Sequence, residues 1–249
     1  MPITIKSESE IKKMRVAGEI TGKALEVAEK NICVGMTTRE LDKIIENYIR
    51  SRNAVPGFLN YRGYPASSCI SINEEVIHGI PGERKLKAGD VVSVDVGAIF
   101  DGYYGDAART FILGETSDEN KKLVEVTRQS FFEGIKFAKS GCHLFEISES
   151  VQDYVEKNGF SVVKDYVGHG IGTIMHEAPE IPNYKQNRRG PKLTAGMTLA
   201  IEPMVNIGTD RVISLDDGWT VITADKKCSA HYENTILICD GEPEILTMV

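Results

Sequence analysis

The sequence predicts an α+β fold in which two similar halves enclose a central polar site. Two pairs of segments with helical spacing alternate with groups of strand-like segments, which favours helices packed on a mixed or antiparallel sheet. Several positions of the first half also recur in the second half. No Pro/Ser-rich linker separates the halves, so we expect one domain over residues 1–249, with halves of about 1–115 and 116–249.

Start signals predict four helices. A Ser or Thr followed three residues later by Glu forms a capping box, and such boxes predict helices from Ser7 to about Asn31, Thr37 to about Arg52 and Thr116 to about Lys139. The apolar spacing from Leu144 to Lys157, which ends before Asn158-Gly159, predicts the fourth helix.

Runs of β-branched and aromatic residues predict the sheet. The expected strands are 67–72, 91–100, 103–113, 198–205, 219–223 and 230–239. Asp101-Gly102 lies between the second and third strands and is a strong hairpin signal. This hairpin would place Asp95 and Asp106 on neighbouring antiparallel strands, where their side chains can meet across one sheet face.

The two halves match at regular offsets. Adding 106 to Gly35, Leu41, Ile45, Tyr48 and Ile49 gives Gly141, Ile147, Val151, Tyr154 and Val155. Adding 107 to Leu86, Ala88, Gly89 and Val94 gives Leu193, Ala195, Gly196 and Ile201. The same 107 takes Asp95 to Glu202, so each half carries a carboxylate at the same place in a strand. We therefore expect a site between two duplicated units.

Composition limits the function classes. A net charge of -7 argues against a broad nucleic-acid-binding face, and the basic stretch 185–192 is more simply a solvated loop. No apolar run approaches the roughly 18 residues of a membrane span and no signal-peptide core is present, so we expect a soluble, cytoplasmic protein. The five cysteines are odd in number and contain no CxxC pair, which favours reduced thiols.

Four carboxylates and one histidine are the most informative side chains. They are Asp95, Asp106, His169, Glu202 and Glu233. Burying an unpaired carboxylate costs several kcal/mol, and few Lys or Arg lie in these segments to pair with them. Any one of them alone could be a surface or structurally paired residue. Together they suit two divalent ions bridged by carboxylates, which predicts dinuclear hydrolysis.

Two further histidines stand in loops. His78 and His176 lie beside glycine or proline turns, where a side chain is either simply solvated or available to stabilise a carbonyl or oxyanion. His143 lies near a helix start and needs no catalytic role. Zincin, dinucleotide-binding and serine-nucleophile motifs are absent from the sequence, so acyl transfer through a covalent enzyme is disfavoured.

Large apolar side chains cluster in predicted loops and could line either a pocket or the core. They are Phe58, Tyr61, Tyr64, Cys69, Met175 and Trp219. The residues alone do not choose between these two uses.

The ligand motifs, in their order, resemble those of methionine aminopeptidases. They are SVDVG (93–97), GDAART (105–110), GHGIG (168–172), IEP (201–203) and HYENT (231–235). The resemblance covers essentially the whole chain and implies the pita-bread fold, with two pseudo-symmetric halves around a dinuclear metal site. It also implies removal of N-terminal methionine from peptides and nascent proteins when the second residue is small, by attack of a metal-bridging water or hydroxide.

The resemblance also assigns roles to residues. Asp106 and Glu233 are the expected bridging ligands, Asp95 a terminal ligand, His169 the nitrogen ligand, and Glu202 both a ligand and a proton carrier. His78 and His176 would contact substrate. The methionine pocket would comprise Phe58, Tyr61, Tyr64, Cys69, Met175 and Trp219. At the positions of Phe58 and Met175 some relatives have a smaller or differently shaped pocket residue. The resemblance therefore defines the reaction more closely than the range of substrate side chains that the pocket accepts.

Cofactors and partners follow from the same resemblance. The family uses two divalent ions, with Co, Mn, Fe and Zn as candidates, and some members hold one monovalent cation at segments that match Asn73, Glu75 and Ser229. Nascent chains, and through them a transient ribosome contact, are the expected partners of a monomeric enzyme.

Two alternatives remain at this level. X-Pro aminopeptidases and prolidases share the five ligands, and noncatalytic pita-bread proteins bind partners without cleaving them. The segments YRGYPAS (61–67) and CISIN (69–73) favour the methionine enzymes. The short interval between His176 and Glu202 favours the type 1, bacterial-like form.

Overall fold

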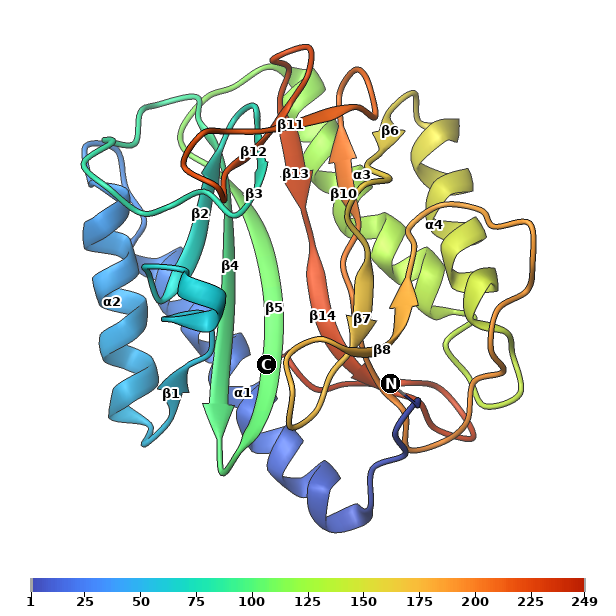
Figure 1. Cartoon of the computed structure of the whole chain (residues 1–249). Helices are drawn as coiled ribbons and strands as arrows, with labels where there is room; N and C mark the ends of the chain where they lie inside the picture. Colours follow the sequence, from blue (N-terminus) through green and yellow to red (C-terminus); the bar gives the residue numbers. More distant parts are fainter. Residues whose placement is uncertain (1, 249) are drawn as a thin grey trace.

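One large, mostly antiparallel sheet forms the centre of the fold (Figure 1). The structure is a computed structural model that describes residues 2–248. The main path of the sheet runs β1 (Val55–Pro56), β4 (Val91–Phe100), β5 (Tyr103–Ile112), β14 (Glu233–Leu237), β9 (Thr198–Ile201), β7 (Gly168–Gly170), β8 (Glu177–Ile181). β2 (Ser68–Ile72) also pairs with β4, and β15 (Glu244–Ile245) with β14. The junction between β5 and β14 joins strands from the two halves of the chain.

Two small sheets flank the large one. One has the order β13 (Ser229–His231), β10 (Met204–Asn206), β6 (Ser161–Val162). The other has the order β11 (Val212–Ser214), β12 (Val221–Thr223), β3 (Glu75–Ile77). β13 is separated from β14 by one residue, so the small and large sheets meet at that point.

Each half carries its own helix pair, as Figure 1 shows in blue for the first half and in green to yellow for the second. The helices are α1 (Glu8–Asn31), α2 (Thr38–Ser51), α3 (Asp118–Ile135) and α4 (Leu144–Lys157), with a short 3-10 helix η1 (Tyr61–Gly63). The capping boxes predicted for α1 and α2 are present. Among the described residues, no helix has the length and apolarity needed to cross a membrane.

Some predicted bounds were wrong for physical reasons. α3 is capped by Ser117 and not by Thr116, because the Thr116 hydroxyl donates to the Gly89 carbonyl. α3 also ends at Ile135, four residues before the predicted Lys139. The strand predicted over 198–205 divides into β9 and β10 around Pro203, which has no N–H to donate to a ladder. The strand predicted over 230–239 divides at Tyr232 into β13 and β14.

The predicted internal repeat has matching contacts in the structure. The Gly35 amide donates to the Leu86 carbonyl at 2.8 Å, and the Gly141 amide donates to the Leu193 carbonyl at 2.9 Å. Both glycines have positive φ angles, 91° and 95°, which side chains other than glycine rarely adopt. The same turn therefore leads into the second helix of each half, which supports the duplication inferred from the sequence.

Each half also has its own apolar core. In the first half, Leu41 and Ile45 of α2 are buried in a cluster with Val94 of β4. In the second half, their counterparts Ile147 and Val151 of α4 are buried in a cluster that also contains residues of β9. The two helix pairs thus pack on one face of the sheet and support the strands that carry the candidate ligands.

Candidate metal centre and active site

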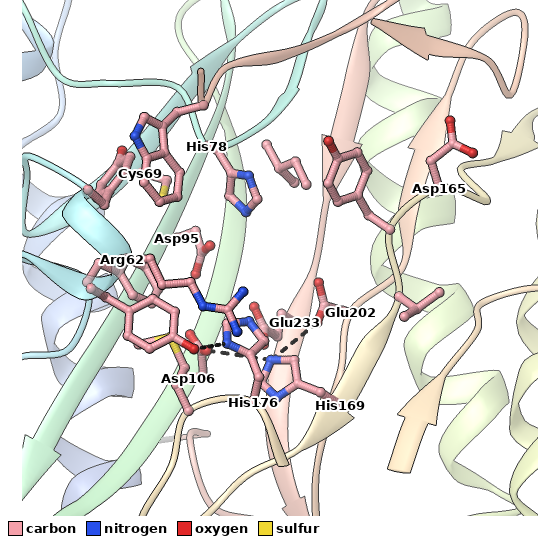
Figure 2. A pocket seen from close by; sticks show the side chains of 18 residues that line it. Arg62, Cys69, His78, Asp95, Asp106, Asp165, His169, His176, Glu202 and Glu233 are labelled. Atoms are coloured by element: carbon pink, nitrogen blue, oxygen red, sulfur yellow. Dashed lines mark hydrogen bonds and ion pairs between the residues drawn. The ribbon is translucent and has the colours of Figure 1, made fainter. Parts of the chain in front are cut away.

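The five predicted ligands converge in one pocket of about 320 Å³. Figure 2 shows the carboxylates of Asp95, Asp106, Glu202 and Glu233 grouped with the His169 ring at its base. Asp95 lies on β4, Asp106 on β5, Glu233 on β14, Glu202 just after β9 and His169 on β7. These strands are consecutive neighbours in the sheet. Each of five adjacent strands therefore supplies one candidate ligand.

Strand register explains how the carboxylates meet. Asp95 and Glu233 both pair with Ala108, on opposite sides of β5. Asp106 stands two residues before Ala108, and residues two apart on a strand face the same side of the sheet. The predicted hairpin thus brings Asp95 and Asp106 together as diagonal neighbours, since the residue opposite Asp106 is Gly97.

The four carboxylates have no basic partner. Asp106 and Glu233 are 5% and 2% exposed, and among the described residues no Lys or Arg forms an ion pair with any of the four. Asp95 Oδ1, Asp106 Oδ1 and Glu233 Oε1 are buried without a hydrogen-bond partner. Buried charges without partners are costly, and cations relieve that cost. The donor set therefore fits divalent metal ions.

Burial also shifts the protonation of these acids. It raises the pKa of Asp95 to about 8. Burial, followed by repulsion from neighbouring carboxylates, raises the pKa values of Asp106, Glu202 and Glu233 well above their ordinary range. Without metal, these four acids therefore bind protons more tightly than exposed carboxyl groups do.

His169 is oriented as a ligand would be. Its Nδ1 lies 2.9 Å from the Gly170 carbonyl, which leaves Nε2 as the free nitrogen. Nε2 lies 3.5 Å from Glu202 Oε1 and 3.9 Å from Asp106 Oδ2. Burial lowers the pKa of His169 to about 3, so the imidazole is neutral and its lone pair is available.

His231 is a site residue to which the sequence analysis gave no role. It ends β13, is 2% exposed, and places Nε2 3.8 Å from Glu233 Oε2 and 3.9 Å from Glu202 Oε2. The signal was present in the sequence, because His231 and Glu233 are two apart in extended backbone and so share a face.

His78 and His176 line the same pocket, as predicted. His176 Nδ1 lies 2.7 Å from the Tyr61 hydroxyl, and the His176 ring centroid lies 4.3 Å from that of His169. His78 follows β3 with a φ angle of 59°, an unusual backbone conformation for a residue with a side chain. Burial lowers the pKa of His78 to about 4 and lowers the pKa of His176. Both rings are therefore neutral near pH 7.

The predicted apolar residues form one wall of the pocket. Phe58, Tyr64, Cys69 and Met175 are buried in one cluster, and Tyr61 and Trp219 pack against it. The Tyr64 and Trp219 rings meet edge to face at 5.0 Å between centroids. The wall therefore offers an apolar recess next to the acidic base of the pocket.

The pocket lining also contains residues that the sequence analysis did not select. They are Arg62, Ile77, Asp165, Tyr166 and Val167. Tyr166 packs edge to face on His78 at 5.8 Å between centroids. Arg62 lies within the quoted YRGYPAS segment and Ile77 lies on β3. Asp165, Tyr166 and Val167 lie in the loop before β7 and carry no motif, so only the fold brings them to the site.

The segments matched to a monovalent-cation site lie close together. The Ser229 amide donates to the Asn73 carbonyl at 2.8 Å. The Glu75 carboxylate accepts from the Ile72 amide at 2.8 Å and from Arg84 Nη1 at 2.7 Å. The Glu75 carboxylate is thus already paired within the protein.

Comparison with known proteins agrees with this geometry. The family model for metallopeptidase family M24 matches residues 12–240. A methionine aminopeptidase of Clostridium acetobutylicum is 56% identical over 247 residues, which is 99% of each chain. The crystal structure of a methionine aminopeptidase from Thermotoga maritima superposes with a TM-score of 0.97 at 46% identity and full coverage of both chains.

The fold and site define a metallopeptidase, and the chain belongs to family M24. The resemblance to methionine aminopeptidases, drawn from its motifs, is confirmed.

The predicted pita-bread fold is confirmed as well. A prolidase from Pyrococcus furiosus superposes with a TM-score of 0.77 over 98% of this chain and 65% of its own. Its identity of 24% shows a shared fold alone.

Proposed function

We propose that this protein is a methionine aminopeptidase, which removes the N-terminal methionine of peptides and nascent proteins when the second residue is small. The observation that carries the proposal is the pocket in which five metal-type ligands adjoin an apolar wall. Full-length relatives that bear this name, at 56% identity in one case, support the same reaction.

Two divalent ions are the proposed cofactors, held by Asp95, Asp106, His169, Glu202 and Glu233. Such ions supply Lewis acidity and a water of lowered pKa. Manganese, iron, cobalt and zinc all suit a set of carboxylates with an imidazole. One monovalent cation near Asn73 and Ser229 is the third ion that we propose.

Glu202 is the proposed proton carrier of the reaction. Its carboxylate lies in the pocket and within 4 Å of two imidazoles, and in the part of the chain that the structure describes no Lys or Arg pairs with it. It would take a proton from the attacking water and deliver it to the leaving amine. A carboxylate that gains and loses a proton at one position serves as base and then as acid.

His176 and His78 are the proposed hydrogen-bond donors to substrate. When Nδ1 of neutral His176 accepts from the Tyr61 hydroxyl, its proton resides on Nε2. That N–H can donate to the scissile carbonyl oxygen and to the oxyanion formed from it. His78 lies on the opposite side of the pocket from His169 in Figure 2. It would contact the part of the substrate that becomes the new N-terminus.

The apolar wall is the proposed methionine subsite. An unbranched thioether packs well against aromatic rings, and sulfur gains additional energy there. Tyr61, Tyr64 and Trp219 supply the rings. Phe58, Cys69 and Met175 complete the recess. The wall would thus select the first residue while the acidic base positions the bond to be cut.

The remaining proposals concern partners and place. Substrates of this reaction are new N-termini, so we expect transient contact with ribosomes and a cytoplasmic location. A monomeric state is a separate proposal. X-Pro peptidase activity and a binding role without catalysis are the two competing functions.

Mass spectrometry of a peptide pool tests the function. Metal-stripped protein resupplied with manganese or cobalt is incubated with peptides that begin Met-Ala, Met-Lys, Leu-Ala and Ala-Pro. Selective loss of methionine before alanine supports the proposal. Cleavage of the Ala-Pro peptide would support the X-Pro function, and no metal-dependent cleavage would support a binding role.

A further inference from the structure

His231 is a second imidazole within 4 Å of the carboxylate cluster, outside the five ligands inferred from the family. Its Nε2 is buried without a hydrogen-bond partner. The nearest acidic atoms are Glu233 Oε2 at 3.8 Å and Glu202 Oε2 at 3.9 Å. A buried polar atom of this kind normally has a partner in the protein or in a bound group.

The position of His231 matches that of His169. His169 Nε2 lies 3.5 Å and 3.9 Å from its two neighbouring carboxylate oxygens, and the corresponding distances for His231 are 3.8 Å and 3.9 Å. Both rings are almost fully buried, at 6% and 2% exposure. The two imidazoles approach the carboxylate cluster from different strands, β7 and β13.

The side chains form two sets of three that share one member. Ligand atoms of Asp106, His169 and Glu233 lie within 4.8 Å of one another, and so do those of Asp95, His231 and Glu233. Ligands that lie about 2.0–2.2 Å from one ion are at most about 4.4 Å apart. The 3.8 Å between His231 Nε2 and Glu233 Oε2 falls within that limit.

Backbone contacts hold His231 in place. Its amide donates to Thr110 Oγ1 at 3.0 Å, and the Thr110 hydroxyl donates to its carbonyl at 2.8 Å. His231 on β13 also pairs with Met204 on β10. The backbone of His231 is therefore held by β5 and by β10, which fixes the point from which the ring projects.

We propose that His231 Nε2 is a sixth metal ligand, which binds the ion held by Asp95 and Glu233. This inference rests on the proposed metal centre. Each ion would then have one nitrogen donor, with Glu233 shared between the two sets. Imidazole favours zinc, cobalt and iron over manganese, so His231 would shift the site toward those metals.

NMR of protein labelled with 15N in its five histidines tests the proposal directly. Zinc is added to the metal-stripped protein up to two equivalents, and the ring nitrogens are assigned with single His→Gln variants. We expect two Nε2 signals, from His169 and His231, to move to positions typical of metal-bound nitrogen. Binding of two zinc ions with only the His169 signal shifted would overturn the proposal and leave the proposed function intact.

Two variants extend the test. His231→Gln should weaken binding of one of the two zinc ions at least about tenfold, and should weaken manganese binding less. His143→Gln is the matched control, because His143 lies at the start of α4 with Nδ1 on the Gly190 carbonyl and should leave both constants unchanged. If His231→Gln weakened zinc binding and manganese binding equally, His231 would not be a nitrogen ligand. A wild-type protein that binds no divalent ion would refute both this proposal and the proposed function.

Discussion

The Tyr61 hydroxyl lies 2.7 Å from His176 Nδ1, which links the apolar wall of the pocket to an imidazole beside the metal-type ligands. Tyr61 belongs to η1 in the first half of the chain, and His176 precedes β8 in the second. The contact spans the two halves and orients the ring that we expect to donate to the scissile carbonyl.

Loss of this contact should weaken catalysis modestly. In Tyr61→Phe, His176 loses a partner that selects its tautomer, so kcat should fall about tenfold, as one hydrogen bond of about 1.4 kcal/mol would predict. Steady-state kinetics with a Met-Ala peptide measures the change. Metal content, measured by atomic emission, should stay at the wild-type value, and a parallel loss of metal would assign Tyr61 a structural role.

Loss of either imidazole should have a larger effect on turnover. His78→Ala and His176→Ala remove the proposed donors to the substrate, and each should lower kcat about 100-fold or more. Both variants should retain their divalent ions. If His176→Ala loses metal and activity to the same extent, then His176 is a ligand or a structural residue.

Thermal stability of the metal-stripped protein should decrease as pH rises. Burial raises the pKa of Asp95 to about 8 from an ordinary value of 3.8, and the other three acids shift in the same direction. Acids that bind protons more tightly when folded stabilise the fold below their ordinary pKa and lose that contribution as pH rises toward the folded pKa. The buried histidines, whose pKa values are lowered, act in the opposite direction only below their ordinary pKa of 6.5. Between about pH 7 and pH 8 we therefore expect Tm to fall by at least about 4 °C.

Calorimetry across this pH range checks the prediction. The metal-loaded protein should show a flatter profile, because the ions replace the protons. Asp95→Asn should also flatten the profile of the stripped protein. A Tm of the stripped protein that rises between pH 7 and pH 8 would contradict the raised pKa values.

The apolar wall should control substrate binding. Trp219 packs edge to face on Tyr64, so Trp219→Ala opens the recess without touching a ligand. KM for a Met-Ala peptide should rise about tenfold, which corresponds to about 1.4 kcal/mol of lost apolar contact. Leu215→Ala, in the same loop but 39% exposed, is the control and should leave KM unchanged. A fall in kcat alone would place Trp219 outside the methionine subsite.

A buried ion pair next to the site should matter for stability. Lys6 Nζ lies 2.6 Å from Glu177 Oε2, with side chains 5% and 8% exposed. Lys6→Met leaves the Glu177 carboxylate with the Thr4 hydroxyl but without its cation, and should lower the free energy of unfolding by roughly 3 kcal/mol. Chemical denaturation measures this loss. Lys13→Met breaks the exposed pair with Asp101 and should change stability little; similar losses in both variants would contradict the distinction.

Local signals in the sequence predict much of this fold. The capping boxes of α1 and α2 and the hairpin at Asp101-Gly102 depend on neighbouring residues, and all three are present. The seven short strands without a prediction, such as β7 and β8, have two to five residues and too little alternation to be recognised. Their pairing is set by distant parts of the chain.

The candidate site likewise contains residues that the local sequence identifies and residues that only the fold brings together. Charged residues in apolar segments identify Asp95 and Glu233 from sequence, because an apolar context makes a carboxylate conspicuous. His231 stands in a segment that the sequence analysis quoted, yet its nearness to Glu202 depends on the pairing of β10 with β13. Tyr166 reaches the pocket only through the folded loop before β7.

The order of the ligands along the chain sets a condition on biosynthesis. Glu233, which belongs to both sets of three, lies on the last long strand of the sheet, and β14 joins the halves by pairing with both β5 and β9. Until that strand has left the ribosome and inserted between its neighbours, neither set of ligands is complete. An enzyme proposed to act on emerging chains would therefore acquire its own metal only after β14, which ends at Leu237, has been synthesised.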